Sequence, residues 1–140
     1  MRLDTILRVC AKLFIPFIFV FGLYVQLHGD YGPGGGFQAG VIIAAGVFLY
    51  AIIYGLSAAQ RAVPKGLVEF MVPMGVLIFA GTGIYSFVVD TNYLDYNNLA
   101  HGDAVEGQHW GIFLVEIGVL VTVASTMIAI FYAFAGRGRQ

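Results

Sequence analysis

Long apolar segments are the feature that most constrains what this chain can fold into. Residues 37–59 carry no charge, and residues 67–89 and 110–135 carry one acidic residue each. A helix crosses a hydrocarbon core of about 30 Å with about 20 residues, because it rises about 1.5 Å per residue. All three segments are long enough to cross, and none shows the two-residue alternation of a transmembrane strand.

A fourth, shorter span is expected at residues 13–27. Its start can extend past Lys12 and Arg8, whose long side chains can reach the membrane interface. A cleaved signal peptide is less favoured, because the apolar stretch is longer than usual and no Ala-x-Ala site closes it. With 59% hydrophobic residues, a 140-residue chain could not bury its apolar surface as a soluble domain. We therefore predict one all-α membrane domain, residues 1–140, with four transmembrane helices.

Basic residues indicate the orientation of the helices. All seven lie before the first span, between the second and third, or after the fourth: Arg2, Arg8, Lys12, Arg61, Lys65, Arg137 and Arg139. The other two connections, residues 28–36 and 90–109, contain no Lys or Arg. The positive-inside rule therefore predicts that both termini are cytoplasmic and that these two connections lie outside.

The outer connection between the first two helices is rich in glycine, and residues 28–37 read HGDYGPGGGF. Glycine permits positive φ and close contact, and non-helical backbone survives at membrane depth only where protein or water covers it. A tight turn required for packing is one interpretation, and backbone N–H groups that face an ion path are another. The residues expected to pack here are Pro33, Gly34, Gly35, Gly36, Phe37 and Gly40.

Small residues also mark one face of the second helix. Gly36, Gly40 and Ala44 recur every four positions and therefore lie on the same side. Lipid gives helices no hydrophobic reason to associate, so such faces let their backbones approach closely instead. Because the chain has little mass outside the membrane, we expect part of its surface to contact other chains.

Glu116 is the principal candidate for a functional residue. It lies about two turns after Trp110 in an apolar segment. A carboxylate in hydrocarbon is costly, so it should face protein or water. A proton or sodium relay and a neutral hydrogen-bonding group between helices are both open. Asp30 and His28 in the outer loop, and Glu69 at the start of the third helix, are further candidates for an ion or proton path, although a helix-terminus role suits Glu69 better.

Several other classes of function are disfavoured. Cys10 is the only cysteine, and His28, His101 and His109 lack the short spacing of a recognised metal site. Phe37, rather than Lys–Ser/Thr, follows the glycines, so no phosphate-binding loop is expected. The net charge of −1 argues against nucleic acid. With no nucleophile–base pair and no cofactor motif, we expect neither an enzyme nor a cofactor.

Two motifs resemble a known family. HGDYGPGGGFQAGVIIAAG, at residues 28–46, resembles the glycine-rich loop and second helix of the MnhB family, the B-type subunits of Mrp-type Na+/H+ antiporters. VEIGV, at residues 115–119, resembles the acidic signature near the last helix of that family. Many members have histidine at the position of Asp30 and aspartate at that of Glu116. The resemblance covers nearly the whole chain.

The resemblance implies a subunit and not a transporter in itself. Mrp systems are assemblies of several membrane proteins that exchange cytoplasmic Na+ for external H+, and their small subunits help to build the complex. We therefore expect a multi-pass subunit in the inner (plasma) membrane, with sister subunits as partners and Na+ and H+ as the transported ions. The equivalent module of a membrane-bound hydrogenase-type respiratory complex and a purely structural scaffold are the alternatives.

Overall fold

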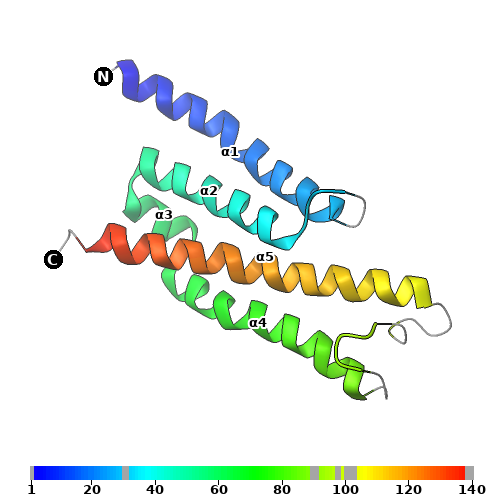
Figure 1. The fold of residues 1–140 in the computed structure, drawn as a ribbon. Coiled ribbons are helices and arrows are strands. Elements are labelled where there is room, and N and C mark those ends of the chain that lie inside the picture. Colours follow the sequence, from blue (N-terminus) through cyan, green and yellow to red (C-terminus); the bar gives the residue numbers. More distant parts are fainter. Residues whose placement is uncertain (1, 30–31, 89–91, 97–98, 100–103, 138–140) are drawn as a thin grey trace.

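The computed structural model describes residues 2–29, 32–88, 92–96, 99 and 104–137. Across these ranges the regular structure is helical (Figure 1). The helices are α1 (Arg2–His28), α2 (Gly36–Tyr54), α3 (Leu56–Ala62), α4 (Lys65–Val88) and α5 (Ala104–Gly136). All but α3 contain segments long and apolar enough to cross a membrane, which confirms the all-α fold with four transmembrane helices.

Gly55 separates α2 from a short helix that the sequence did not predict. The apolar run continues to Ala59, but α2 ends at Tyr54, because Gly55 has a φ of 91°, a conformation that side chains with a Cβ rarely adopt. The Gly55 N–H still donates to the carbonyl of Ala51 at 2.9 Å, and the chain then turns into α3. The buried residue Ala59 therefore belongs to α3.

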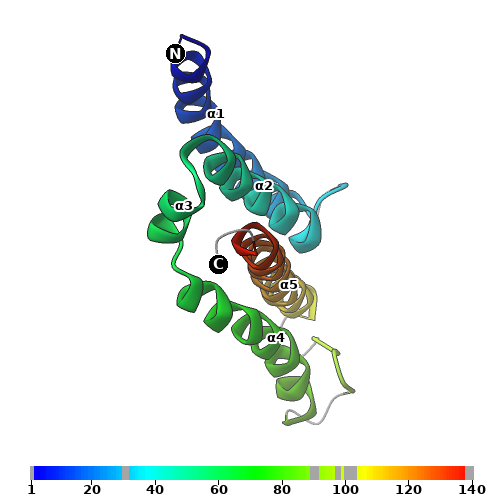
Figure 2. The same ribbon diagram turned by 90° about the vertical axis from the view of Figure 1, so that its left-hand side faces the viewer.

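The four long helices pack as a single curved row. The extensive contacts join α1 to α2, α2 to α5, and α5 to α4, and α1 contacts α5 only marginally. The turned view in Figure 2 shows this order, with α3 beside the row. A single row, unlike a closed bundle, leaves much of each helix surface without a neighbour among the described residues, although α3 covers part of α2 and α5 on one face.

Glycines bring the helix backbones of the row together. A Cβ on Gly40 of α2 would lie 2.9 Å from the carbonyl oxygen of Leu120 in α5. At the next contact, a Cβ on Gly75 of α4 would lie 2.7 Å from the carbonyl oxygen of Gly118, and one on Gly118 would lie 2.9 Å from that of Gly75. Backbones this close have packing contacts that replace the missing hydrophobic drive.

The start of α1, the end of α5 and α3 lie at one end of the row, and the described loop residues 32–35 and 92–96 lie at the other (Figure 1). Arg61 and Lys65 are therefore at the same end as Arg137. This arrangement fits the predicted topology, in which the basic end is cytoplasmic and the glycine loop is outside. The orientation itself stays a prediction of the positive-inside rule.

Candidate functional site

Glu116 of α5 reaches across to the glycine loop. Its Oε1 lies 2.6 Å and its Oε2 2.8 Å from the point where a Cβ on Gly29 would sit. Its Oε1 also lies 3.1 Å from the corresponding point on Gly35. The carboxylate thus fills the space that side chains at both loop positions would need, and the residue is half-buried.

The backbone of Glu116 is contacted as closely as its side chain. A Cβ on Gly36, the first residue of α2, would overlap the carbonyl oxygen of Glu116. Gly29, Gly35 and Gly36 therefore surround this residue, and we call these three the glycine cradle. A side chain at Gly36 could not be accommodated without moving α2 away from α5, and one at Gly29 or Gly35 would require the Glu116 carboxylate to shift.

The loop keeps its shape by bonding back to the end of α1. Gly32 N–H donates to the carbonyl of His28 at 3.1 Å, and Gly35 N–H donates to that of Val25 at 3.2 Å. Gly35 has a φ of 119°, and a Cβ on Gly34 would lie 2.7 Å from the Val25 oxygen. The loop folds tightly against both α1 and Glu116, and this explains why a run of glycines directly precedes the apolar helix α2.

Two helix ends meet at the carboxylate. The first turn of α2, which begins at Gly36, carries a partial positive charge, and the last turn of α1, which ends at His28, carries a partial negative one. Gly35 caps α2 without a side chain, so no side-chain cap bond forms there. The partial positive charge at the start of α2 stabilises an ionised Glu116 carboxylate, and the partial negative charge at the end of α1 destabilises it. A positive charge added nearby would shift this balance toward the ionised form.

Gln26 is a site residue that the sequence analysis missed. It is only 5% exposed, and neither its Nε2 nor its Oε1 has a hydrogen-bond partner among the described residues. It precedes Gly29 by three positions, so both residues lie on one side of the last turn of α1. A signal was available, because Gln26 is the only amide in an otherwise apolar run from Leu13 to Leu27.

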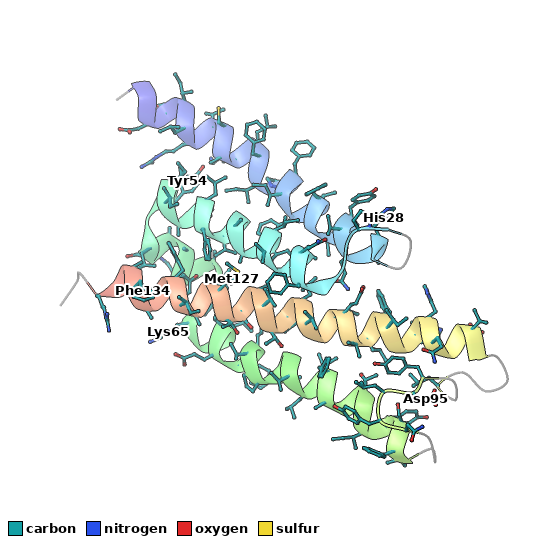
Figure 3. All side chains as sticks on the ribbon, viewed as in Figure 1. His28, Tyr54, Lys65, Asp95, Met127 and Phe134 are labelled. Carbon is teal, nitrogen blue, oxygen red and sulfur yellow. The ribbon has the colours of Figure 1, made fainter. Side chains whose placement is uncertain are left out.

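Of the other predicted path residues that the structure describes, His28 lies next to the loop and Glu69 does not. Its ring stacks on that of Tyr24 at 5.3 Å, and Tyr24 is 57% exposed. Figure 3 shows His28 at the loop end of α1, on the side away from α5. The ring therefore does not point toward Glu116.

The remaining acidic candidates are not brought to the cradle. Glu69 lies in the first turns of α4, at the opposite end of the row, with its side chain exposed and its Oε1 3.6 Å from Nζ of Lys65. An exposed ion pair of this kind contributes little to stability. Asp30 lies outside the described residues. In the part of the chain that the structure describes, no three His, Cys, Asp or Glu side chains gather as metal ligands would.

The predicted packing residues divide between two surfaces. Gly35, Gly36 and Gly40 are buried and turn toward α1 or α5. Pro33 and Phe37 are exposed and line an apolar groove of about 470 Å³ between α1 and α2. The buried glycines therefore pack against other helices of this chain, and the large side chains of Pro33 and Phe37 face outward.

Four spanning helices in an open row, with one carboxylate held at the loop end, define a small multi-pass membrane protein. The family follows from comparison. The model described as "Domain related to MnhB subunit of Na+/H+ antiporter" matches residues 6–129. The chain belongs to the MnhB family, and it is a multi-pass protein of the plasma membrane. The matched segment contains Gln26, the glycine cradle and Glu116.

Similar proteins match over nearly their full length. The chain is 27% identical to the B-type subunit of the Na(+)/H(+) antiporter of Bacillus subtilis (strain 168), with 89% of this chain and 92% of that protein covered. It is 29% identical to the putative antiporter subunit mnhB2 of Staphylococcus haemolyticus (strain JCSC1435), with 95% of each covered. For mnhB2 of Staphylococcus aureus (strain Newman) the identity is 26%, again with 95% of each covered.

Proposed function

We propose that this chain is a membrane subunit of a multisubunit Na+/H+ antiporter, and that Glu116 carries a proton or Na+ within that complex. The family and the names of its relatives support the first statement. The second is carried by one observation, the placement of the Glu116 carboxylate against the backbone of Gly29 and Gly35. The chemistry is non-covalent, as expected of a secondary transporter subunit and not of an enzyme.

A single carboxylate can couple two cations by competition. When Glu116 is ionised it attracts Na+, and when it is protonated it is neutral and does not. In a site shielded from water both states interact more strongly with their surroundings than they would in solution. Binding one ion therefore requires release of the other, which is the elementary step of antiport.

The glycine cradle suits this role because it confines the carboxylate without covering it with side chains. Backbone carbonyl oxygens can then approach a cation at Glu116, and backbone N–H groups can donate to its ionised carboxylate. At the same time Gly36 fixes α2 against the Glu116 backbone, so the position of the carboxylate is set by helix packing. A residue held in this way keeps its geometry while its charge changes.

The row architecture supports the role of a subunit. Large apolar side chains of α1, such as Phe14, Phe17 and Phe21, are more than half exposed. A half-buried carboxylate at Glu116 needs protein or water beside it in the membrane. Sister subunits packed on the open faces of the row would supply both the apolar contacts and the walls of an ion path.

Replacing Glu116 by Gln tests the proposed role. The variant keeps the size of the side chain and one acceptor oxygen but cannot ionise, so we expect antiport in everted vesicles to fall at least about tenfold while the complex assembles at normal yield. Glu116→Asp should retain part of the activity. Glu69→Gln, which changes an exposed acid at the other end of the row, is the matched control and should leave antiport unchanged.

Disassembly of the Glu116→Gln complex would instead identify the carboxylate as a structural contact between subunits. Normal antiport in a fully assembled Glu116→Gln complex would exclude Glu116 from the ion path. In that case the chain would be a scaffold subunit, the alternative that the tight backbone contact at Gly36 favours.

A further inference from the structure

The buried amide of Gln26 has no hydrogen-bonding role in the described structure. Its side chain is 5% exposed, and neither polar atom has a partner among the described residues. Burial of an amide without a partner is costly, and nearly all buried polar groups in proteins are satisfied by protein, water or an ion. An ion or another polar ligand at this position would satisfy the amide.

Helical spacing places Gln26 on the side of α1 that carries Gly29, the side that faces the Glu116 carboxylate. Gln26 and Gly29 are three positions apart, so their Cα–Cβ directions leave the last turn of α1 on the same side. At Gly29 that direction leads to the carboxylate, because Oε1 of Glu116 lies 2.6 Å from the Cβ position. Gln26 thus lies about one helical turn before Gly29, on the face of α1 that the carboxylate approaches.

The end of α1 adds oxygen atoms to this site. The last four carbonyls of a helix have no partner within it, and they give its end a partial negative charge. Loop N–H groups donate to two of these carbonyls, those of Val25 and His28. In membrane transporters, carbonyls at interrupted helix ends are recurrent ligands of Na+.

We propose that Oε1 of Gln26 and the carboxylate of Glu116 are ligands of one monovalent cation, Na+, at the C-terminal end of α1. Hard cations prefer oxygen ligands, and this place offers a carboxylate, an amide oxygen and a helix end. One carboxylate with neutral oxygens balances a single positive charge. This inference rests on the proposed role of Glu116 and adds a neutral ligand that sets the affinity for the ion.

The test uses the complete antiporter complex in everted membrane vesicles, with the Na+ concentration varied at one pH. Gln26→Met keeps an unbranched buried side chain but removes both polar atoms. We expect the Na+ concentration for half-maximal antiport to rise about tenfold, as for the loss of one neutral ligand, with little change in maximal rate or complex yield. Gln38→Met is the matched control, because Gln38 is exposed in the groove between α1 and α2.

A second readout follows occupancy without transport. Dicyclohexylcarbodiimide labels carboxyl groups within membranes, and mass spectrometry of the Glu116 peptide measures the labelling. Na+ should protect Glu116 in the unaltered complex, and Gln26→Met should need about tenfold more Na+ for the same protection. Protection with the same Na+ dependence in both complexes would count against the amide as a ligand.

The proposal is overturned if Gln26→Met changes neither the Na+ concentration for half-maximal antiport nor the Na+ concentration that protects Glu116 from labelling. If that variant does not assemble, Gln26→Asn repeats the test, since it keeps the amide but withdraws its oxygen by about one C–C bond, roughly 1.5 Å. Failure of both variants to assemble makes the amide structural and also overturns the proposal. A third outcome separates the two proposals. If Glu116→Gln loses antiport while Gln26→Met shows the normal Na+ dependence, Gln26 is not a ligand of the cation, but the proposed role of Glu116 is retained.

Discussion

At the scale of single residues, glycine is required where another group already occupies the place of a Cβ. At Gly29 and Gly35 that group is the Glu116 carboxylate, and at Gly36 it is the Glu116 backbone. Gly35 has in addition a φ of 119° with a ψ of 176°, a region used almost only by glycine. Lack of space therefore favours glycine at all three cradle positions, and backbone conformation favours it in addition at Gly35.

Gly35→Val should block assembly of the complex. The new side chain would meet the Glu116 carboxylate and would strain the backbone by about 1–3 kcal/mol, so the loop could not close on α1 and α5. Yield of the complex in mild detergent measures the effect. Gly66→Val is the control, because a Cβ on Gly66 has no neighbour within 4 Å and its φ is ordinary. Normal yield and activity of the Gly35 variant would disprove the steric argument.

At the scale of elements, tyrosines hold the connections onto the helices. The Tyr132 hydroxyl of α5 donates to the carbonyl of Val63 at 3.0 Å, which fixes the turn between α3 and α4. At the loop end, Tyr96 is buried against Gly111. Burial, with a smaller effect from Tyr93, raises the pKa of Tyr96 above 10.0, so the docked segment favours the neutral phenol and loses that contribution only at pH above 10.

Gly111→Ala should release the segment that contains Tyr96. A Cβ on Gly111 would overlap the Tyr96 ring close to its own backbone, so rotation of the ring alone cannot relieve the contact. We expect faster amide hydrogen exchange for residues 92–96, measured by mass spectrometry on the assembled complex. Gly81→Ala, at a position with open space around the Cβ, should leave exchange in this segment unchanged. Unaltered exchange in both variants would show that the segment is held by other contacts.

The sequence is most informative about elements that are continuous in the chain. Four apolar segments predict four spans, because the length of a membrane helix is set by the bilayer. Gly55 is not recognisable as a helix end, since a glycine in an apolar run looks like any other small packing residue. The glycine loop and Glu116 each stand out in the sequence, but their contact joins distant parts of the chain and depends on which helices become neighbours. Gln26 becomes informative only when its burial is known.

At the scale of the whole molecule, the row makes the chain incomplete as a membrane protein on its own. Helix α1 lies at the end of the row. Only 11% of an apolar 18-residue stretch of α1 is buried within the chain, compared with 39% of the corresponding stretch of α2. Lipid can cover apolar side chains, but a half-buried carboxylate and a buried amide within the membrane need polar or protein surroundings. The open faces and the polar site together favour assembly with other subunits.

Affinity purification of the tagged chain tests this view. In mild detergent we expect it to bring down several other membrane proteins of an antiporter, identified by mass spectrometry, because the open faces need partners. Partners of a hydrogenase-type respiratory complex would place the same module in a redox-driven system. Recovery of the chain alone, as a stable homo-oligomer, would contradict the subunit role and favour a small channel.

The open row also has a consequence for the life of the chain in the cell. A newly inserted copy that finds no sister subunit has a half-buried acid, and a buried amide without a partner among the described residues, within a thin layer of helices. Such copies should be recognised by membrane quality-control proteases and degraded, while assembled copies persist. The abundance of this protein would then follow the supply of its partners and not its own rate of synthesis.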